Sequence, residues 1–208
     1  MKAFPRRLLN RLALMTTVLL FVAADALAQT KTAHEVAEAV KNEMITLIGD
    51  REKIAAEGEG KYYEAVVKLF DPVVDFGFIA NGVMGDYAKT ASDEQKQKFA
   101  GALKESLLGT VSTYTQGLGG NEKFSIRVLP PRDSDAGKNN VQVGLEVIAG
   151  ESTNQLSFSM FQNKEQEWKI YNMTLNGINL GITFRAQFAQ AVKKAEGNLD
   201  VAIAGWSS

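Results

Sequence analysis

The spacing of apolar residues changes near Phe124, and this change constrains the fold more than any other feature of the sequence. Before Phe124, apolar residues recur at intervals of three or four, which is the period of a helix packed on one face. After it, apolar and polar residues alternate, which is the period of a strand with one buried face. Helices followed by strands are typical of an α+β domain, in which helices cover an antiparallel sheet.

Two capping boxes mark the start of helices in the first half of the chain. Thr32 and Ser92 each precede a Glu or Gln by three residues, a pattern that satisfies two N–H groups at a helix N-terminus. Gly49 is expected to end the first helix, and Asp75 is expected to cap a later one. The predicted helices cover residues 32–49, 62–70, 75–83 and 93–116, and 50–60 is a loop or a weak helix. The longest helix carries an apolar stripe of Phe99, Leu103, Leu107, Val111 and Tyr114.

The second half contains segments with strand alternation. The first of them ends before two consecutive prolines, which cannot donate hydrogen bonds to a β-ladder. The polar segment 132–140 is predicted to be a mobile hairpin loop. Short polar connections favour an antiparallel meander, with four predicted strands at 124–128, 141–147, 156–160 and 168–175.

The last predicted strand leads directly into a helix. Alternation divides the strand between two faces, with Tyr171, Met173 and Leu175 on one and Trp168 and Ile170 on the other. An Asn-Gly turn follows, and then a helix whose apolar stripe contains Phe184, Phe188 and Val192. A strand and a helix joined this closely have to pack against each other.

Residues 1–28 have the composition of a cleaved secretory signal. A basic start precedes an apolar run, Leu12 to Ala24, which is too short to span a bilayer readily, and Ala26-Leu27-Ala28 is a small-x-small cleavage site. A membrane anchor is the alternative. The chain has no cysteine, so it has neither a disulfide nor an acceptor for a lipid anchor. We expect cleavage after Ala28 and a single exported, soluble domain of residues 29–208.

Charge and motifs exclude several function classes. Without residues 1–28, the chain keeps 19 basic and 23 acidic residues, a net charge of −4, which gives no reason to expect nucleic-acid binding. The sequence contains no G-x-S-x-G elbow, H-E-x-x-H, phosphate loop or Cys/His cluster. We therefore predict no enzyme, metal or cofactor, although scattered catalytic groups remain the alternative.

The segment 168–188 also carries a family resemblance. It contains a Trp-Lys-x-Tyr strand, a Gly-Ile-x-Leu turn and Phe-Arg-x-Gln-Phe. Upstream, Val-Asp-Phe at 74–76 is followed by Ile-Ala at 79–80 and Met-Gly at 84–85. Together these pieces resemble the MlaC (toluene-tolerance) family over roughly residues 36–203. The resemblance implies a periplasmic phospholipid carrier of Gram-negative bacteria, with a four-stranded sheet and surrounding helices related to the NTF2-like cone.

The resemblance further implies a hydrophobic cavity between the sheet and the helices, whereas the residues alone leave a filled core as the alternative. The strand residues expected to line it are Val143, Leu145, Val147, Phe158, Met160, Tyr171 and Met173. The helix residues expected to close it are Phe76, Ile79, Val83, Leu103, Leu107, Phe184 and Phe188. Arg185 could contact a lipid phosphate or pair with a surface acid. One chain of ~16 carbons offers on the order of 12 kcal/mol on burial, so low head-group selectivity is expected.

The implied function is exchange of phospholipid between the outer and inner membranes, for an ABC-type system that maintains outer-membrane lipid asymmetry. The implied partners are an outer-membrane lipoprotein–porin complex and an inner-membrane ABC transporter with an MCE-domain subunit. Two alternatives stay open: a carrier of another hydrophobic solute, such as a hopanoid or quinone, and an NTF2-like enzyme. The chain departs from the family pattern at Asn172, Asn176 and Asn179, which removes charge near the turn.

Overall fold

The computed structural model describes residues 31–118 and 124–206. The predicted signal peptide and its cleavage site after Ala28 lie outside the described residues. The helices are α1 (Ala33–Gly49), α2 (Arg51–Ala56), α3 (Lys61–Phe70), α4 (Phe76–Met84), α5 (Asp93–Gly117), α6 (Leu180–Lys194) and α7 (Leu199–Ala204). Short 3-10 turns, η1 (Gly85–Lys89) and η2 (Asp133–Asp135), follow α4 and β1 (Phe124–Val128). The predicted weak helix is thus α2.

The predicted helix caps are confirmed. Thr32 Oγ1 accepts from the Glu35 N–H at 3.2 Å, and the Glu35 carboxylate accepts from the Thr32 N–H at 2.7 Å. These two bonds complete the capping box of α1. Ser92 caps α5 in the same way. The Asp75 carboxylate accepts from the Phe78 N–H at 2.8 Å and so begins α4. These helix starts are set locally, because each cap needs only residues three apart.

The sheet is an antiparallel meander of five strands, not four. The predicted four are β1, β2 (Asn140–Ala149), β3 (Ser152–Gln162) and β4 (Trp168–Leu175), and β5 (Ile178–Asn179) pairs with the end of β4. Asn176 and Gly177 both have positive φ, 48° and 82°, as the two central residues of a tight hairpin turn require. The turn therefore reverses the chain and adds a two-residue strand before α6.

A β-bulge in β4 overturns the predicted division of its side chains. Met160 pairs with Ile170, but the next residue of β3, Ser159, pairs with Asn172, so Tyr171 is the extra residue. Ile170 and Met173 consequently pack together against the apolar face of the sheet. The prediction that placed Tyr171 with Met173 is wrong, because strict alternation holds only along an unbroken ladder.

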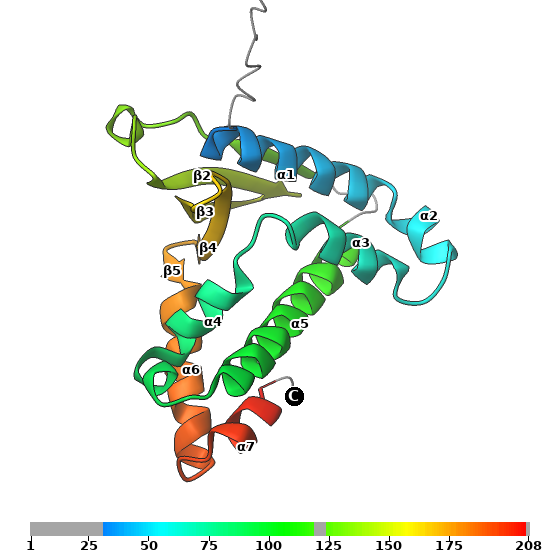
Figure 1. The fold of residues 1–208 in the computed structure, drawn as a ribbon. Helices are drawn as coiled ribbons and strands as arrows, with labels where there is room; N and C mark the ends of the chain where they lie inside the picture. Colours follow the sequence, from blue (N-terminus) through cyan, green and yellow to red (C-terminus); the bar gives the residue numbers. More distant parts are fainter. Residues whose placement is uncertain (1–30, 119–123, 207–208) are drawn as a thin grey trace, which may run out of the picture.

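Three apolar clusters join these elements. The sheet cluster joins α1 to the sheet and consists of Ala33, Ala37, Val141, Val143, Leu145, Phe158, Met160 and Ile170. The central cluster joins α1, α3, α5 and the start of α4 through Met44, Leu47, Ile48, Tyr62, Val66, Leu69, Phe76 and Leu108. The helical cluster consists of Ala80, Val83, Met84, Ala91, Phe99, Leu103, Phe188, Val192, Ala202 and Ile203. Figure 1 shows α1 across the sheet, with α4, α5, α6 and α7 in a second, helical layer.

The buried face of α5 changes along its length. Phe99 and Leu103 belong to the helical cluster, whereas Leu108 belongs to the central cluster. Tyr114, expected in the apolar stripe, is 55% exposed. Thr115 is buried instead, and it accepts a hydrogen bond from the Tyr62 hydroxyl at 3.0 Å. The prediction of a single apolar stripe along α5 is therefore wrong at its C-terminal end. The N-terminal part of α5 packs on α4 and α7, whereas the C-terminal part packs on α3.

Candidate functional site

An open groove of about 350 Å³ lies where the two layers meet. It is formed by the linker between α3 and α4 (residues 71–75, called the linker below), the first residue of α4, the first half of α5 and the start of β4. The residues that line it are Asp71, Val74, Asp75, Phe76, Ala100, Gly101, Lys104 and Lys169. In Figure 1 the linker runs beside β4 before it enters α4.

The apolar lining of the groove connects all three clusters. Val74 packs against both the sheet cluster and the central cluster. Phe76 belongs to the central cluster, and Ala100 packs against the helical cluster. Gly101 leaves open space, since a Cβ built there meets no atom within 4 Å. The groove is thus a surface opening whose lining residues pack in or against all three clusters, and the boundary between these clusters is called the seam below.

The linker is attached to β4 by backbone hydrogen bonds. The Ile170 N–H donates to the Val73 carbonyl at 2.7 Å, and the Asp75 N–H donates to the Ile170 carbonyl at 3.0 Å. These bonds form a parallel bridge between Val74 and Ile170 at an edge of β4 that β5 does not cover. The linker therefore moves with the sheet unless these bonds break.

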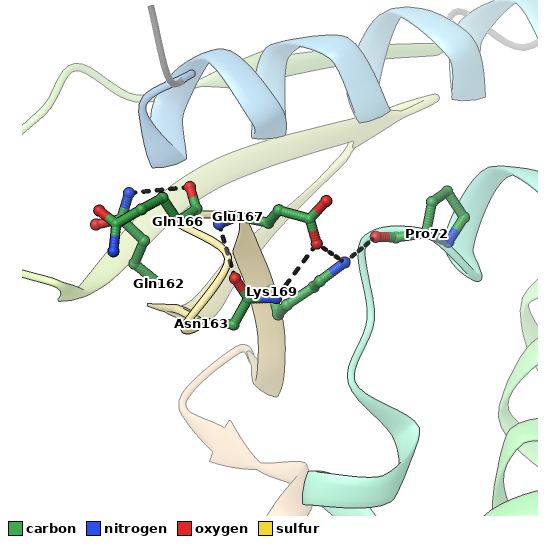
Figure 2. Close-up of polar contacts among 6 residues, drawn as sticks. All are labelled: Pro72, Gln162, Asn163, Gln166, Glu167 and Lys169. Atoms are coloured by element: carbon green, nitrogen blue, oxygen red, sulfur yellow. Dashed lines mark hydrogen bonds and ion pairs between the residues drawn. The ribbon is translucent and has the colours of Figure 1, made fainter.

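A lysine from each layer also holds the linker. From α5, the Lys104 ammonium forms an ion pair with Asp71 and lies 5.7 Å from the centroid of the Phe76 ring, within cation–π range. From β4, the Lys169 ammonium donates to the Pro72 carbonyl at 2.8 Å and to the Glu167 carboxylate at 2.9 Å, as Figure 2 shows. Both lysine side chains are largely covered, with 30% and 21% of their surface exposed.

The start of β4 is braced from the other side by the turn that precedes it. Asn163 donates to the Glu167 carboxylate at 3.2 Å and accepts from the Glu167 N–H at 2.8 Å (Figure 2). The hydrogen bonds from Lys169 and then Asn163 hold the pKa of the Glu167 carboxyl below its ordinary value. Glu167 is therefore held between Asn163 and the lysine that contacts the linker.

The structure places the predicted lining residues in separate groups. The strand residues Val143, Leu145, Phe158, Met160 and Met173 pack in or against the sheet cluster, with Val147 half-buried on the same face. The helix residues Ile79, Val83, Leu103, Leu107, Phe184 and Phe188 pack in or against the helical cluster. Phe76 alone of the predicted set lines the groove.

These two groups do not face each other across one cavity, because α1 covers the apolar face of the strands. The prediction placed the helices that follow Pro72 over this face. Burial of the alanines at 33 and 37 lets α1 approach the sheet closely, and this position leaves α4 and α6 to pack with α5 and α7. Lipid contacts of the predicted residues stay a prediction.

Tyr171 lies apart from both groups. Its ring is 5.5 Å from that of Phe78 and 5.8 Å from that of Phe161, both in edge-on geometry. Its hydroxyl donates to the Asn140 side chain at 3.2 Å. The bulge therefore moves this residue from the predicted lining into a surface aromatic group.

Arg185 links α6 to α4 in the structure, and its contact with a lipid phosphate stays a prediction. Its Nε donates to the Gly82 carbonyl at 2.8 Å, in the last turn of α4, and its side chain passes beside Gly85. It is near enough to Asp86 to help lower the pKa of that carboxyl, whose main partner is Lys89. Arg185 is not among the residues that line the groove, and it joins α6 to the C-terminus of α4.

Most of the groove could not be predicted from the sequence. Lys104 stands next to the apolar stripe of α5, and Lys169 stands between two apolar residues of β4, positions at which lysine is usually a solvated neighbour of the core. The pairing of both with residues 71 and 72 spans 33 and 97 positions of sequence. No local pattern encodes such pairs, and only Pro72, as the mark of a break between helices, pointed to the linker.

Within residues 31–118 and 124–206, no helix combines the length and apolar character needed to cross a bilayer. The same residues contain no cluster of three or more His, Asp or Glu side chains that could hold a metal ion. The residues that line the groove combine apolar side chains with two lysines and two aspartates. Such a site suits an amphipathic molecule.

Comparison with known proteins agrees in sequence and in fold. The family model for the MlaC protein matches residues 38–208. The toluene tolerance protein Ttg2D of Pseudomonas putida is 30% identical over 178 residues, which cover 85% of this chain and 80% of that protein. A phospholipid-binding protein from Ralstonia solanacearum, solved in complex with a phospholipid, superposes with a TM-score of 0.74 at 20% identity and covers 85% of this chain and 95% of its own. The chain is a member of the MlaC family.

Proposed function

We propose that this protein is a periplasmic phospholipid carrier that takes an acyl chain into the seam behind the groove. The observation that carries the proposal is the convergence of three apolar clusters on one surface opening. The phospholipid bound by the Ralstonia protein supports it, as does membership of the MlaC family. The work of such a protein is binding and release, not catalysis.

Binding requires the layers to separate. A groove of about 350 Å³ is at the small end of ligand pockets, which range over roughly 300–1,000 Å³. Leu107 packs against the helical and central clusters, and Ile126 packs against the sheet and central clusters, so an acyl chain that enters between the clusters would part contacts of this kind. Each buried CH₂ contributes about 0.8 kcal/mol, which can offset the cost of parting these contacts.

The carrier would exchange lipid with complexes in the two membranes: an outer-membrane lipoprotein–porin complex and an inner-membrane ABC transporter with an MCE-domain subunit. Such a cycle maintains the lipid asymmetry of the outer membrane. The signal-like residues 1–28 support export. A carrier has to release its cargo, and a binding site at a surface seam, opened by the partner, would allow release without unfolding.

The test is to purify the protein from periplasm, extract it with organic solvent and identify the lipid by mass spectrometry. We compare the wild type with Gly101→Leu, which adds an apolar side chain to the groove, and with Gly109→Leu as the matched control. Both glycines lie in α5 with open space at the Cβ position, and only Gly101 lines the groove. We expect phospholipid in the wild type and the control, and at least fivefold less in Gly101→Leu.

Each contrary result has a clear meaning. Another apolar solute in the extract would make the protein a carrier of that solute. An empty extract from all three proteins would contradict lipid carriage. Full lipid occupancy in a folded Gly101→Leu variant would show that the chain enters elsewhere.

A further inference from the structure

The lining of the groove includes charged residues of both signs, which a lipid head group could meet. Lys104 and Lys169 supply two ammonium groups, and Asp71 and Asp75 supply two carboxylates. They come from α5, β4 and the linker, so the arrangement exists only in the folded chain. These four groups sum to a net charge of zero, and the Glu167 carboxylate that pairs with Lys169 adds one negative charge beside them. The groove therefore differs from the cationic site that a purely anionic ligand would favour.

The two lysines retain hydrogen-bond donors. An ammonium group has three N–H bonds. Among the described residues, Lys104 donates to Asp71, and Lys169 donates to Glu167 and to the Pro72 carbonyl. Two donors of Lys104 and one of Lys169 therefore have no protein acceptor there. Both lysines line the groove, so these donors belong to the same opening.

The carboxylates of Asp71 and Asp75 can accept further hydrogen bonds. One oxygen of Asp75 accepts from the Phe78 N–H, and its second oxygen has no partner among the described hydrogen bonds. Asp71 accepts from Lys104 and is half-exposed, with 53% of its side-chain surface open. A ligand with a phosphate and a nearby ammonium group can therefore satisfy both kinds of group, whereas a second negative charge would be repelled by the aspartates.

We propose that Lys104 and Lys169 bind the phosphate of a zwitterionic phospholipid whose chain enters the groove, and that Asp71 and Asp75 face its ammonium group. This inference rests on the proposed function and adds a head-group preference to it. It replaces the low selectivity expected from chain burial alone. The lipid phosphate would accept from donors that Lys104 and Lys169 do not use to hold the linker, so the linker can keep its backbone hydrogen bonds to β4 while the head group binds.

The experiment offers the protein three lipids with the same two palmitoyl chains: phosphatidylethanolamine, phosphatidylglycerol and diacylglycerol, in equal amounts in one vesicle. After incubation the protein is re-isolated and its lipids are quantified by mass spectrometry. The variants are Lys104→Gln/Lys169→Gln and, as a charge-matched control, Lys89→Gln/Lys98→Gln. The control lysines also pair with acids, Asp86 and Glu94, but do not line the groove.

The wild type and the control should take up phosphatidylethanolamine several-fold over phosphatidylglycerol. Loss of two charge-assisted hydrogen bonds should lower uptake of phosphatidylethanolamine about a hundredfold in the groove variant, with diacylglycerol uptake unchanged. Unchanged diacylglycerol uptake also reports that the variant is folded. Asp71→Asn should raise the share of phosphatidylglycerol.

Four results would overturn the inference. A groove variant with the wild-type ratio of phosphatidylethanolamine to diacylglycerol would show that the lysines do not bind the head group. An equal fall of all three lipids would assign them to holding the linker only. Micromolar binding of inorganic phosphate to lipid-free protein by calorimetry would make the site one for free anions. Failure of the wild type to take up any lipid, diacylglycerol included, would remove the proposed function itself.

Discussion

Asn172 and Asn179 are hydrogen-bonded to each other at the N-terminus of α6, with 3.1 Å between Asn172 Nδ2 and Asn179 Oδ1. Each also accepts from a backbone N–H of the first turn: Asn172 from Gly181 at 3.0 Å, and Asn179 from Ile182 at 3.0 Å. The sequence motifs lead us to expect both positions to differ from the family pattern. The pair shows that two uncharged amides can satisfy a helix start that would otherwise leave its donors unpaired.

Replacing either asparagine should destabilise the fold. Asn179→Ala removes an N-cap and should cost about 1 kcal/mol, and Asn172→Ala leaves the Gly181 N–H without its partner at a similar or slightly larger cost. Urea unfolding monitored by circular dichroism measures both. Asn81→Ala, on the exposed side of α4, is the control and should be neutral or mildly stabilising. A loss no larger at positions 172 and 179 than at 81 would contradict the capping role.

Two helical glycines should respond to alanine in opposite directions. A Cβ at Gly181 would lie 2.8 Å from Asn172 Oδ1, so Gly181→Ala should displace that amide and cost about 1–3 kcal/mol. A Cβ at Gly109 meets nothing within 4 Å, so Gly109→Ala should stabilise α5 by about 0.5–1 kcal/mol. Thermal melts of the two variants give the sign directly. Equal shifts would mean that the start of α6 adapts freely.

The Tyr62 hydroxyl should make stability depend on alkaline pH. Burial raises the pKa of Tyr62 in the folded protein, and the hydrogen bond to Thr115 offsets part of that effect. The unfolded chain therefore loses this proton at lower pH than the folded protein. The contribution of the protonated hydroxyl to the free energy of unfolding is fully present below the ordinary pKa of about 10 and declines as pH rises above it. Urea midpoints between pH 8 and roughly pH 11 should fall more steeply for the wild type than for Tyr62→Phe.

Near neutral pH, Tyr62→Phe should lower the free energy of unfolding. Tyr62→Phe keeps the ring in the central cluster and removes one buried hydrogen bond, at a cost of about 1 kcal/mol. The Thr115 hydroxyl still donates to the Val111 carbonyl at 2.7 Å, so it keeps a partner. Parallel pH profiles for the two proteins would show that another group causes the alkaline loss.

Leu145 tests whether the sheet face is core or cavity. Leu145 is 3% exposed and packs in the sheet cluster under α1, so Leu145→Arg buries an unpaired charge and should cost several kcal/mol, enough to unfold the domain. Gln142→Arg, on the exposed face of the same strand, should melt within a few degrees of the wild type. A folded Leu145→Arg variant that has lost its lipid would place the cargo under α1 instead of at the linker groove.

The starts of α1, α4 and α5 and the limits of β1 and β4 follow from the sequence, because their causes are local. Thr32, Ser92 and Asp75 each cap a helix within three residues, and alternation from Phe124 onward sets which strand residues face the core. The family resemblance also rests on local motifs in a fixed order, and it identified the family correctly. The fifth strand was not predicted, because two residues are too few to show the alternation of a strand.

Only the tertiary structure decided which surfaces meet. The bulge at Tyr171, the placement of α1 over the sheet and the change of buried face along α5 all depend on contacts between distant segments. The groove is the clearest case, since Lys104 and Lys169 reach the linker from two layers that the sequence orders but does not position. Local patterns determine which face of an element is apolar, whereas the partner of that face depends on the packing of the whole domain.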